Sequence, residues 1–168
     1  VNMIIANKKS IRENKIKFIF ACRVKNPLDA KKKKQIVEKL KKANILNHVI
    51  FTDTFRNMAK LYNLSDIVIF PVRDMKGKFD VPLAAIEPMA CEKPVIISSL
   101  PILREFANNQ NAVIIEAGNM GQLWQSLMDL KSNKDKRTSL GIAGRKFTER
   151  FFDIKNIAQQ YAKIYEKL

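Results

Sequence analysis

The sequence predicts an α/β fold, a Rossmann-like parallel sheet of about five strands with helices on both faces and a helical C-terminal part. Short, mostly apolar runs alternate with helix-like segments as far as Ile115. Strands that alternate with helices form parallel sheets through right-handed crossovers. From Met120 onward the periodicity is helical only.

Five runs have the length and apolar character of strands buried on both faces. They are Ile16–Cys22, Val49–Thr52, Asp66–Val72, Pro94–Ser98 and Ala112–Ile115. Four segments between them have helical spacing: Asp29–Ala43, Phe55–Tyr62, Leu83–Cys91 and Pro101–Ala107. In the second of these helices we expect Met58, Ala59 and Tyr62 to face inward.

Three helices are predicted to close the chain, Met120–Leu130, Asp135–Phe152 and Ile154–Leu168. We expect the second to be interrupted near Gly141 and Gly144. The third carries an apolar stripe that must either cover the chain's own core or find a partner. No repeat or linker divides the sequence, so we predict a single domain over residues 1–168.

Length and composition indicate a globular protein. The 168 residues suffice for one core, and 46% of them are apolar. The N-terminal segment lacks the apolar region and cleavage site of a signal peptide, and the run Ile67–Val72 is too short to cross a bilayer. We therefore predict a cytoplasmic location, with membrane association left open by the charge.

The cysteines and the histidine predict no metal or redox chemistry. Cys22 and Cys91 lack the spacing of such motifs, so we expect small buried hydrophobic residues in a reducing compartment. The only histidine, His48, is expected in a surface turn. One histidine excludes a multi-histidine metal centre, and we predict no metal.

The net charge of +15 allows three interpretations. A lysine-rich solvated surface is one, and attraction to an anionic membrane surface is another. Nucleic-acid binding is the third, but it requires stacking aromatic residues or a docking helix, and the run Lys31–Lys34 has no aromatic residue nearby. We predict no nucleic-acid partner.

Ligands of such sheets bind outside the carboxyl ends of the strands. Four loops lie there, Arg23–Asn26, Asp53–Phe55, Arg73–Pro82 and Ser98–Pro101, of which Arg73–Pro82 is the longest. It leads into a helix near Pro82, a residue suited to a first turn. The amides of Leu83, Ala84 and Ala85 then form an anion site, to which Lys78 adds charge. A diphosphate fits this site.

Glu87 lies about 6 Å further along the predicted helix. A carboxylate beside a phosphate site can accept two hydrogen bonds from a ribose diol. The alternative is a structural glutamate held in a salt bridge. Pro88 follows and removes a helical hydrogen bond, so we expect a kink or an irregular first turn.

Four segments together resemble the donor domain of the family 4 (group 1) retaining glycosyltransferases, which have the GT-B fold. They are HVIFTDTFRNMAKLYNLSD, NLSDIVIFPV, IEPMACEKPVIIS and LGIAGRKFTERFFDIKNIAQQYAKIY. By this resemblance Glu87 is the second glutamate of the family's donor motif and contacts the ribose, and the nucleobase stacks near Phe51–Asp53. The donor-binding set we predict is Glu87, Asp80, Lys78, Val81, Pro82, Leu83, Ala84, Phe51, Thr52, Asp53 and Arg23.

Two departures from the family pattern limit what the resemblance implies. The first glutamate of the motif falls on Phe79, and Asp80 replaces it only at a spacing one residue short. The family's opening Gly-Arg strand and Lys-Gly turn, whose basic residues neutralise the donor diphosphate, do not occur in this sequence. We assign no catalytic residue, and we expect a donor-binding fragment of a two-domain enzyme that is inactive alone.

The resemblance implies transfer of a sugar from a nucleoside diphosphate sugar to an acceptor, with retained configuration and without a cofactor or metal. A second hypothesis is a non-catalytic nucleotide-sugar-binding subunit that pairs with a separate acceptor-domain chain. A third, a receiver-like regulator, requires acidic residues at the ends of the early strands, where this sequence has Cys22 and Arg23.

Overall fold

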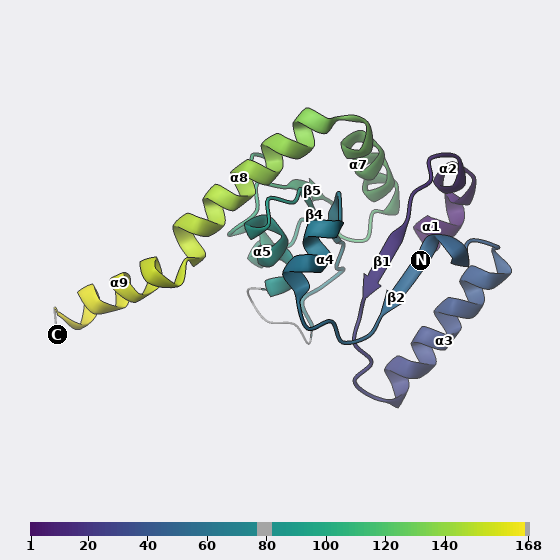
Figure 1. Cartoon of the computed structure of the whole chain (residues 1–168), viewed down its shortest axis with the longest axis horizontal. Helices are drawn as coiled ribbons and strands as arrows, with labels where there is room; N and C mark the ends of the chain where they lie inside the picture. The colour runs from purple at the N-terminus through teal and green to yellow at the C-terminus, as the bar shows by residue number, and fades with distance from the viewer. Residues whose placement is uncertain (77–81, 167–168) are drawn as a thin grey trace. The chain divides into compact units, whose positions relative to one another are not determined.

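The computed structural model describes residues 1–76 and 82–166 (Figure 1). The chain divides into two compact units, Val1–Asn57 and Met58–Leu168, and each is described by itself. The predicted site residues Lys78, Asp80 and Val81 lie outside the described residues, as does Phe79.

The first unit holds a two-stranded parallel sheet. It contains α1 (Asn2–Ala6), α2 (Lys8–Glu13), β1 (Phe18–Ala21), α3 (Pro27–Lys42), the 3₁₀ turn η1 (Leu46–His48) and β2 (Val49–Thr52). Phe18 pairs with Val49 and Ala21 with Thr52, so both strands end at the same edge. The core consists of Met3, Ile4, Ile11, Phe18, Leu40, Ile45 and Val49.

Local signals define α3. The Asn26 side chain accepts a hydrogen bond from the Asp29 amide at 2.9 Å, and Pro27 occupies the first turn, where its missing N–H costs nothing. The helix therefore begins two residues before the predicted boundary.

The second unit holds a three-stranded parallel sheet in the order β3-β4-β5. Its strands are β3 (Val68–Phe70), β4 (Val95–Ser98) and β5 (Val113–Ile115). Its helices are α4 (Met58–Leu64), α5 (Leu83–Ala90), α6 (Pro101–Arg104), α7 (Met120–Ser132), α8 (Lys134–Phe152) and α9 (Ile154–Tyr165). All four residues of β4 are buried, as expected of a central strand.

The α/β class, the parallel strands and the helical C-terminal part are confirmed. The five described strands form two separate sheets, of two and three strands. Strand positions agree with the sequence-based prediction, although β1 and β3 are shorter at both ends.

The predicted interruption of the helix at Gly141 and Gly144 is wrong, because α8 runs unbroken from Lys134 to Phe152. Both glycines are buried where α8 packs on α5. A Cβ atom on Gly141 would lie 2.2 Å from the carbonyl oxygen of Glu92, and one on Gly144 would lie 3.3 Å from the Met89 Cβ. The glycines permit close helix packing and do not break the helix.

The final helix, α9, extends beyond the rest of its unit (Figure 1), and none of its residues is buried. Ile154 is 74% exposed and Tyr165 is 69% exposed. The apolar stripe of this helix was expected either to cover the chain's own core or to bind a partner. The described residues of α9 do not cover the core.

Several expected environments are wrong in detail. Cys22 is exposed and Cys91 is half-buried, so neither is a core residue. Ala59 is exposed, whereas Tyr62 is buried as expected. His48 is half-buried, and its Nδ1 lies 2.8 Å from the carbonyl oxygen of Ile16, which fixes η1 against the segment before β1.

Candidate functional site

Glu87 lies in the second turn of α5, and its side-chain partner is Tyr62 of α4. Tyr62 is buried, and it interacts with the Glu87 carboxylate. Burial raises the pKa of Tyr62, and the negative charge of Glu87 and hydrogen bonding to this carboxylate raise it further. Tyr62 thus stays neutral beside the carboxylate.

The salt bridge considered for Glu87 is not found among the ion pairs of the described residues. Glu87 is half-buried. A carboxylate accepts up to about four hydrogen bonds, so one that lies beside a single tyrosine can still accept two from a diol.

The first turn of α5 combines a 3₁₀-type hydrogen bond with a regular helical one, and both lie before Pro88, for which a kink or irregular turn was predicted. The Ala85 amide donates to the Pro82 carbonyl at 2.8 Å, and the Ile86 amide donates to the same oxygen at 3.3 Å. The shorter bond is of the 3₁₀ type. Because Ala85 is bonded inside the turn, the predicted anion site is reduced to the amides of Leu83 and Ala84. Both residues are exposed.

Pro88 lies inside α5, which continues to Ala90. Beyond it, Glu92 adopts a φ of 56°, and the Lys93 amide donates to the Pro88 carbonyl at 2.9 Å. The half-buried thiol of Cys91 lies in the same turn. Burial and then the charge of Glu87 raise its pKa, so the thiol is protonated at neutral pH and is a poor nucleophile.

The loops that follow β3 and β5 also approach each other in the second unit. Arg73 follows β3, and its Nε would lie 3.9 Å from a Cβ on Gly118, which follows β5 and has a φ of 83°. Ser98 ends β4 with its hydroxyl fully buried and without a hydrogen-bond partner among the described residues.

In the first unit the predicted base-binding residues lie at the end of β2. Phe51 stacks on Phe20, with ring centroids 5.4 Å apart. Asp53 is exposed and its carboxylate lies 2.6 Å from the Lys33 ammonium. Arg23 is exposed beyond β1, at the same edge as Asp53.

Thr52 carries a buried hydroxyl oxygen that has no partner within the described chain. An unpaired buried hydroxyl costs about 1–3 kcal/mol, so it is rare unless a ligand or water completes it. It lies at the edge where a ligand of this sheet is expected.

Sequence reasoning placed Tyr62 inward but did not connect it with Glu87, because the two residues belong to different helices. The amphipathic spacing of α4 shows only that Tyr62 is buried. A buried tyrosine usually needs a hydrogen-bond partner for its hydroxyl. This requirement was the one feature of the sequence that pointed to a polar neighbour of Tyr62.

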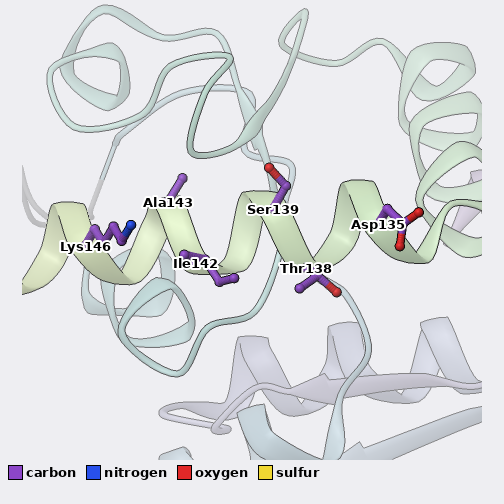
Figure 2. Close-up of a pocket in the computed structure, with 6 residues that line it drawn as sticks. All are labelled: Asp135, Thr138, Ser139, Ile142, Ala143 and Lys146. Atoms are coloured by element: carbon purple, nitrogen blue, oxygen red, sulfur yellow. The ribbon is translucent and has the colours of Figure 1, made fainter.

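A shallow hollow elsewhere in the second unit is a poor candidate. Its lining residues all come from α8, and Figure 2 shows them along that single helix. They are Asp135, Thr138, Ser139, Ile142, Ala143 and Lys146. No second element of the described part of the chain lines it, and its lining residues lie away from the strand ends, so we assign it no ligand.

Among the described helices, none combines the length and apolar character needed to cross a bilayer.

Comparisons with known proteins agree with this architecture. An uncharacterized glycosyltransferase of Methanocaldococcus jannaschii is 27% identical over 128 residues, which are 74% of this chain and 35% of that protein. Anabaena HepE in complex with UDP superposes with a TM-score of 0.80 and 14% identity, covering 99% of this chain and 52% of HepE. The chain thus spans about half of HepE and about a third of the archaeal relative.

The C-terminal domain of a glycosyl transferase group 1 protein from Francisella tularensis superposes with a TM-score of 0.67 and 19% identity. The match covers 88% of this chain and 93% of that domain. The fold is therefore that of a GT-B C-terminal-like domain. The family model of the group 1 glycosyl transferases matches residues 1–147, and the chain belongs to that family.

Proposed function

We propose that this chain is the donor-binding domain of a retaining, family 4 glycosyltransferase, which passes a sugar from a nucleoside diphosphate sugar to an acceptor. The observation that carries the proposal is the position of Glu87, half-buried in α5 and in interaction with the buried Tyr62. The family match supports it, as do the neighbouring HepE structures, which contain UDP, UDP with glucose, and UDP-glucose.

In this proposal Glu87 accepts hydrogen bonds from the two ribose hydroxyls. The donor diphosphate lies at the start of α5, where the amides of Leu83 and Ala84 and the helix dipole attract negative charge. This charge grows on the leaving group as the glycosidic bond breaks, so the same groups stabilise the transition state. Lys78, Asp80 and Val81 stay predicted members of this site.

The end of β2, in the first unit, stays the predicted base-binding segment, as the family resemblance implies. The ring of Phe51 offers an apolar surface, and the Thr52 hydroxyl, which has no partner among the described residues, offers a hydrogen bond to a base edge. Asp53 forms an ion pair with Lys33, so its negative charge is partly neutralised at the end of β2.

Calorimetric titration of the chain with UDP and with GDP tests the proposal. We expect Glu87→Ala to weaken binding of the preferred nucleotide at least tenfold, which is a loss of about 1.4 kcal/mol in binding free energy. The fold should stay intact. Glu92→Ala is the matched control, because Glu92 is exposed and lies just beyond the same helix. Equal affinities for wild type and Glu87→Ala would refute the assignment.

A second candidate function is a non-catalytic nucleotide-sugar-binding subunit that pairs with a separate acceptor-domain chain. The exposed apolar face of α9, formed by Ile154, Tyr161, Ile164 and Tyr165, favours such a partner. Gel filtration with a co-expressed acceptor domain tests it. Co-elution that Ile154→Asp and Ile164→Asp abolish supports pairing, whereas strictly monomeric elution of both chains argues against it.

A further inference from the structure

The positive charge of the chain is concentrated in the first unit. Residues 1–57 contain 15 lysines and arginines against four aspartates and glutamates, a net charge of +11 out of the total of +15. Unit 1 is the shorter of the two. A uniformly solvated lysine-rich surface does not explain this asymmetry.

Much of this charge lies on one helix, α3. Six of its lysines are exposed: Lys31, Lys32, Lys34, Lys39, Lys41 and Lys42. None of the six takes part in an ion pair within the described residues, and Glu38 is the single exposed acidic residue of the helix. The seventh lysine, Lys33, is half-buried and is neutralised by Asp53.

The buried face of α3 determines which of its lysines point to solvent. Leu40 is fully buried, and Ile36 and Val37 are half-buried, so this side of the helix packs on its own unit. At 100° per residue, Lys31 and Lys42 lie on the far side together with Glu38, and Lys34 and Lys41 lie on the adjoining flank. The helix of 16 residues is about 24 Å long, which makes an extended basic surface.

The composition of this surface distinguishes between anionic partners. It contains lysine and no arginine, whereas recognition of nucleic-acid phosphates favours the bidentate guanidinium. It contains no aromatic residue on which a base could stack. Leu28 is 69% exposed beside the lysines, and a leucine among lysines suits a lipid interface, where it enters the apolar layer.

We propose that the lysine face of α3 binds the surface of an anionic lipid bilayer. Each lysine near an anionic leaflet adds to the attraction, and a cluster of four to eight is typical of such surfaces. The contact is peripheral and depends on salt, because the charges are exposed. It places the unit against a membrane without a spanning helix. This inference does not depend on the proposed donor site.

Sedimentation with vesicles of phosphatidylcholine alone, or with one third phosphatidylglycerol, tests the proposal. We expect binding to the anionic vesicles that is at least tenfold tighter than to the neutral ones and that falls steeply from low to physiological salt. Equal binding to both vesicles, or none to either, would overturn it.

Charge-matched variants test the location. Lys31→Gln, Lys34→Gln, Lys41→Gln and Lys42→Gln combined should reduce the affinity for anionic vesicles at least tenfold. The control neutralises four exposed basic residues of unit 2, Arg104, Lys131, Lys134 and Lys146, and should reduce the affinity less than threefold. Equal losses in both variants would contradict a site on α3.

Two further experiments distinguish lipid binding from loss of folding and from nucleic-acid binding. Lys31→Arg, Lys34→Arg, Lys41→Arg and Lys42→Arg combined keep the charge and should retain binding, so a failure of the glutamine variant to fold does not remove the test. Competition with single-stranded RNA and duplex DNA at equal phosphate concentration should leave most of the chain on the anionic vesicles. Transfer of the chain to nucleic acid would overturn the lipid assignment.

Discussion

Tyr62 of α4 interacts with the Glu87 carboxylate of α5 across the contact between the two helices. This interaction connects the core of the second unit to its candidate ligand site. Tyr62 is buried, so packing sets its position beside Glu87. In the proposed site, a tyrosine held in this way orients the carboxylate before a ligand arrives, which reduces the entropy lost on binding.

The first prediction concerns the ionisation of Tyr62. Its pKa is raised by burial and by Glu87, so the difference in phenolate absorbance between wild type and Tyr62→Phe should appear only well above pH 10. A raised pKa in the folded state contributes stability that is complete below pH 10 and is lost as the pH rises above it. Glu87→Gln should shift the difference signal to lower pH. A signal centred at pH 10 in the wild type would contradict the contact.

Tyr62→Phe should also weaken nucleotide binding, by roughly threefold to tenfold, because Glu87 loses the group that orients it. Calorimetry measures this effect. Ser65→Ala is a suitable control, since Ser65 follows the same helix and its hydroxyl bonds only to the Leu61 carbonyl within the described residues. Wild-type affinity in Tyr62→Phe would show that the tyrosine is merely structural.

A second prediction concerns the glycines of the long helix. Gly141→Ala places a methyl group against the Glu92 carbonyl oxygen and should destabilise the fold by about 2–3 kcal/mol. Gly144→Ala should cost less, because its neighbour is the flexible Met89 side chain. Gly121→Ala in α7 meets only the Asn119 side chain at 3.4 Å and should be neutral or stabilising. Thermal unfolding of the three variants should give this order, and equal melting temperatures would contradict the packing.

Two buried hydroxyls without a partner among the described residues give a third prediction. Ser98→Ala removes one of them and should stabilise the chain by about 1 kcal/mol without affecting nucleotide binding. Thr52→Val should likewise preserve or raise stability, but it should weaken nucleotide binding severalfold. Denaturant unfolding and calorimetry together separate the two outcomes. Wild-type affinity in Thr52→Val would exclude Thr52 from the site.

A fourth prediction concerns α9. Because none of its residues is buried, ending the chain after Asp153 should change the melting temperature by less than about 3 °C. Leu130→Ala, which removes a fully buried side chain from α7, should lower it considerably more, through a loss of about 2–5 kcal/mol. A large loss of stability on truncation would show that α9 packs on its own unit.

The sequence predicted the elements of the fold well because apolar runs and turn residues act locally. Asn26 and Pro27 mark the start of α3, and the run Val95–Ser98 is apolar enough to identify a central strand. Gly141 was misinterpreted because glycine has two roles in helices. It can weaken a helix, or it can allow a neighbouring backbone to approach closely, and the sequence alone does not distinguish the two. Only the nearby Glu92 carbonyl distinguishes them.

The candidate site was predictable in part. Glu87 was found from its motif and its position in a helix that follows a sheet edge. Its partner Tyr62 and the bonded amide of Ala85 depend on tertiary contacts that no spacing rule contains. The exposure of Cys22 was missed because cysteines are usually buried, and the end of a short strand overrides that tendency.

The central claim is that Glu87 recognises a ribose diol. Calorimetric titration with a nucleoside diphosphate and its 2′-deoxy analogue, on wild type and on Glu87→Gln, tests it most directly. The wild type should prefer the ribose form by about tenfold, and Glu87→Gln should lose most of this preference, while Glu92→Gln keeps it. An undiminished preference in Glu87→Gln, or equal binding of both nucleotides by the wild type, would contradict the claim.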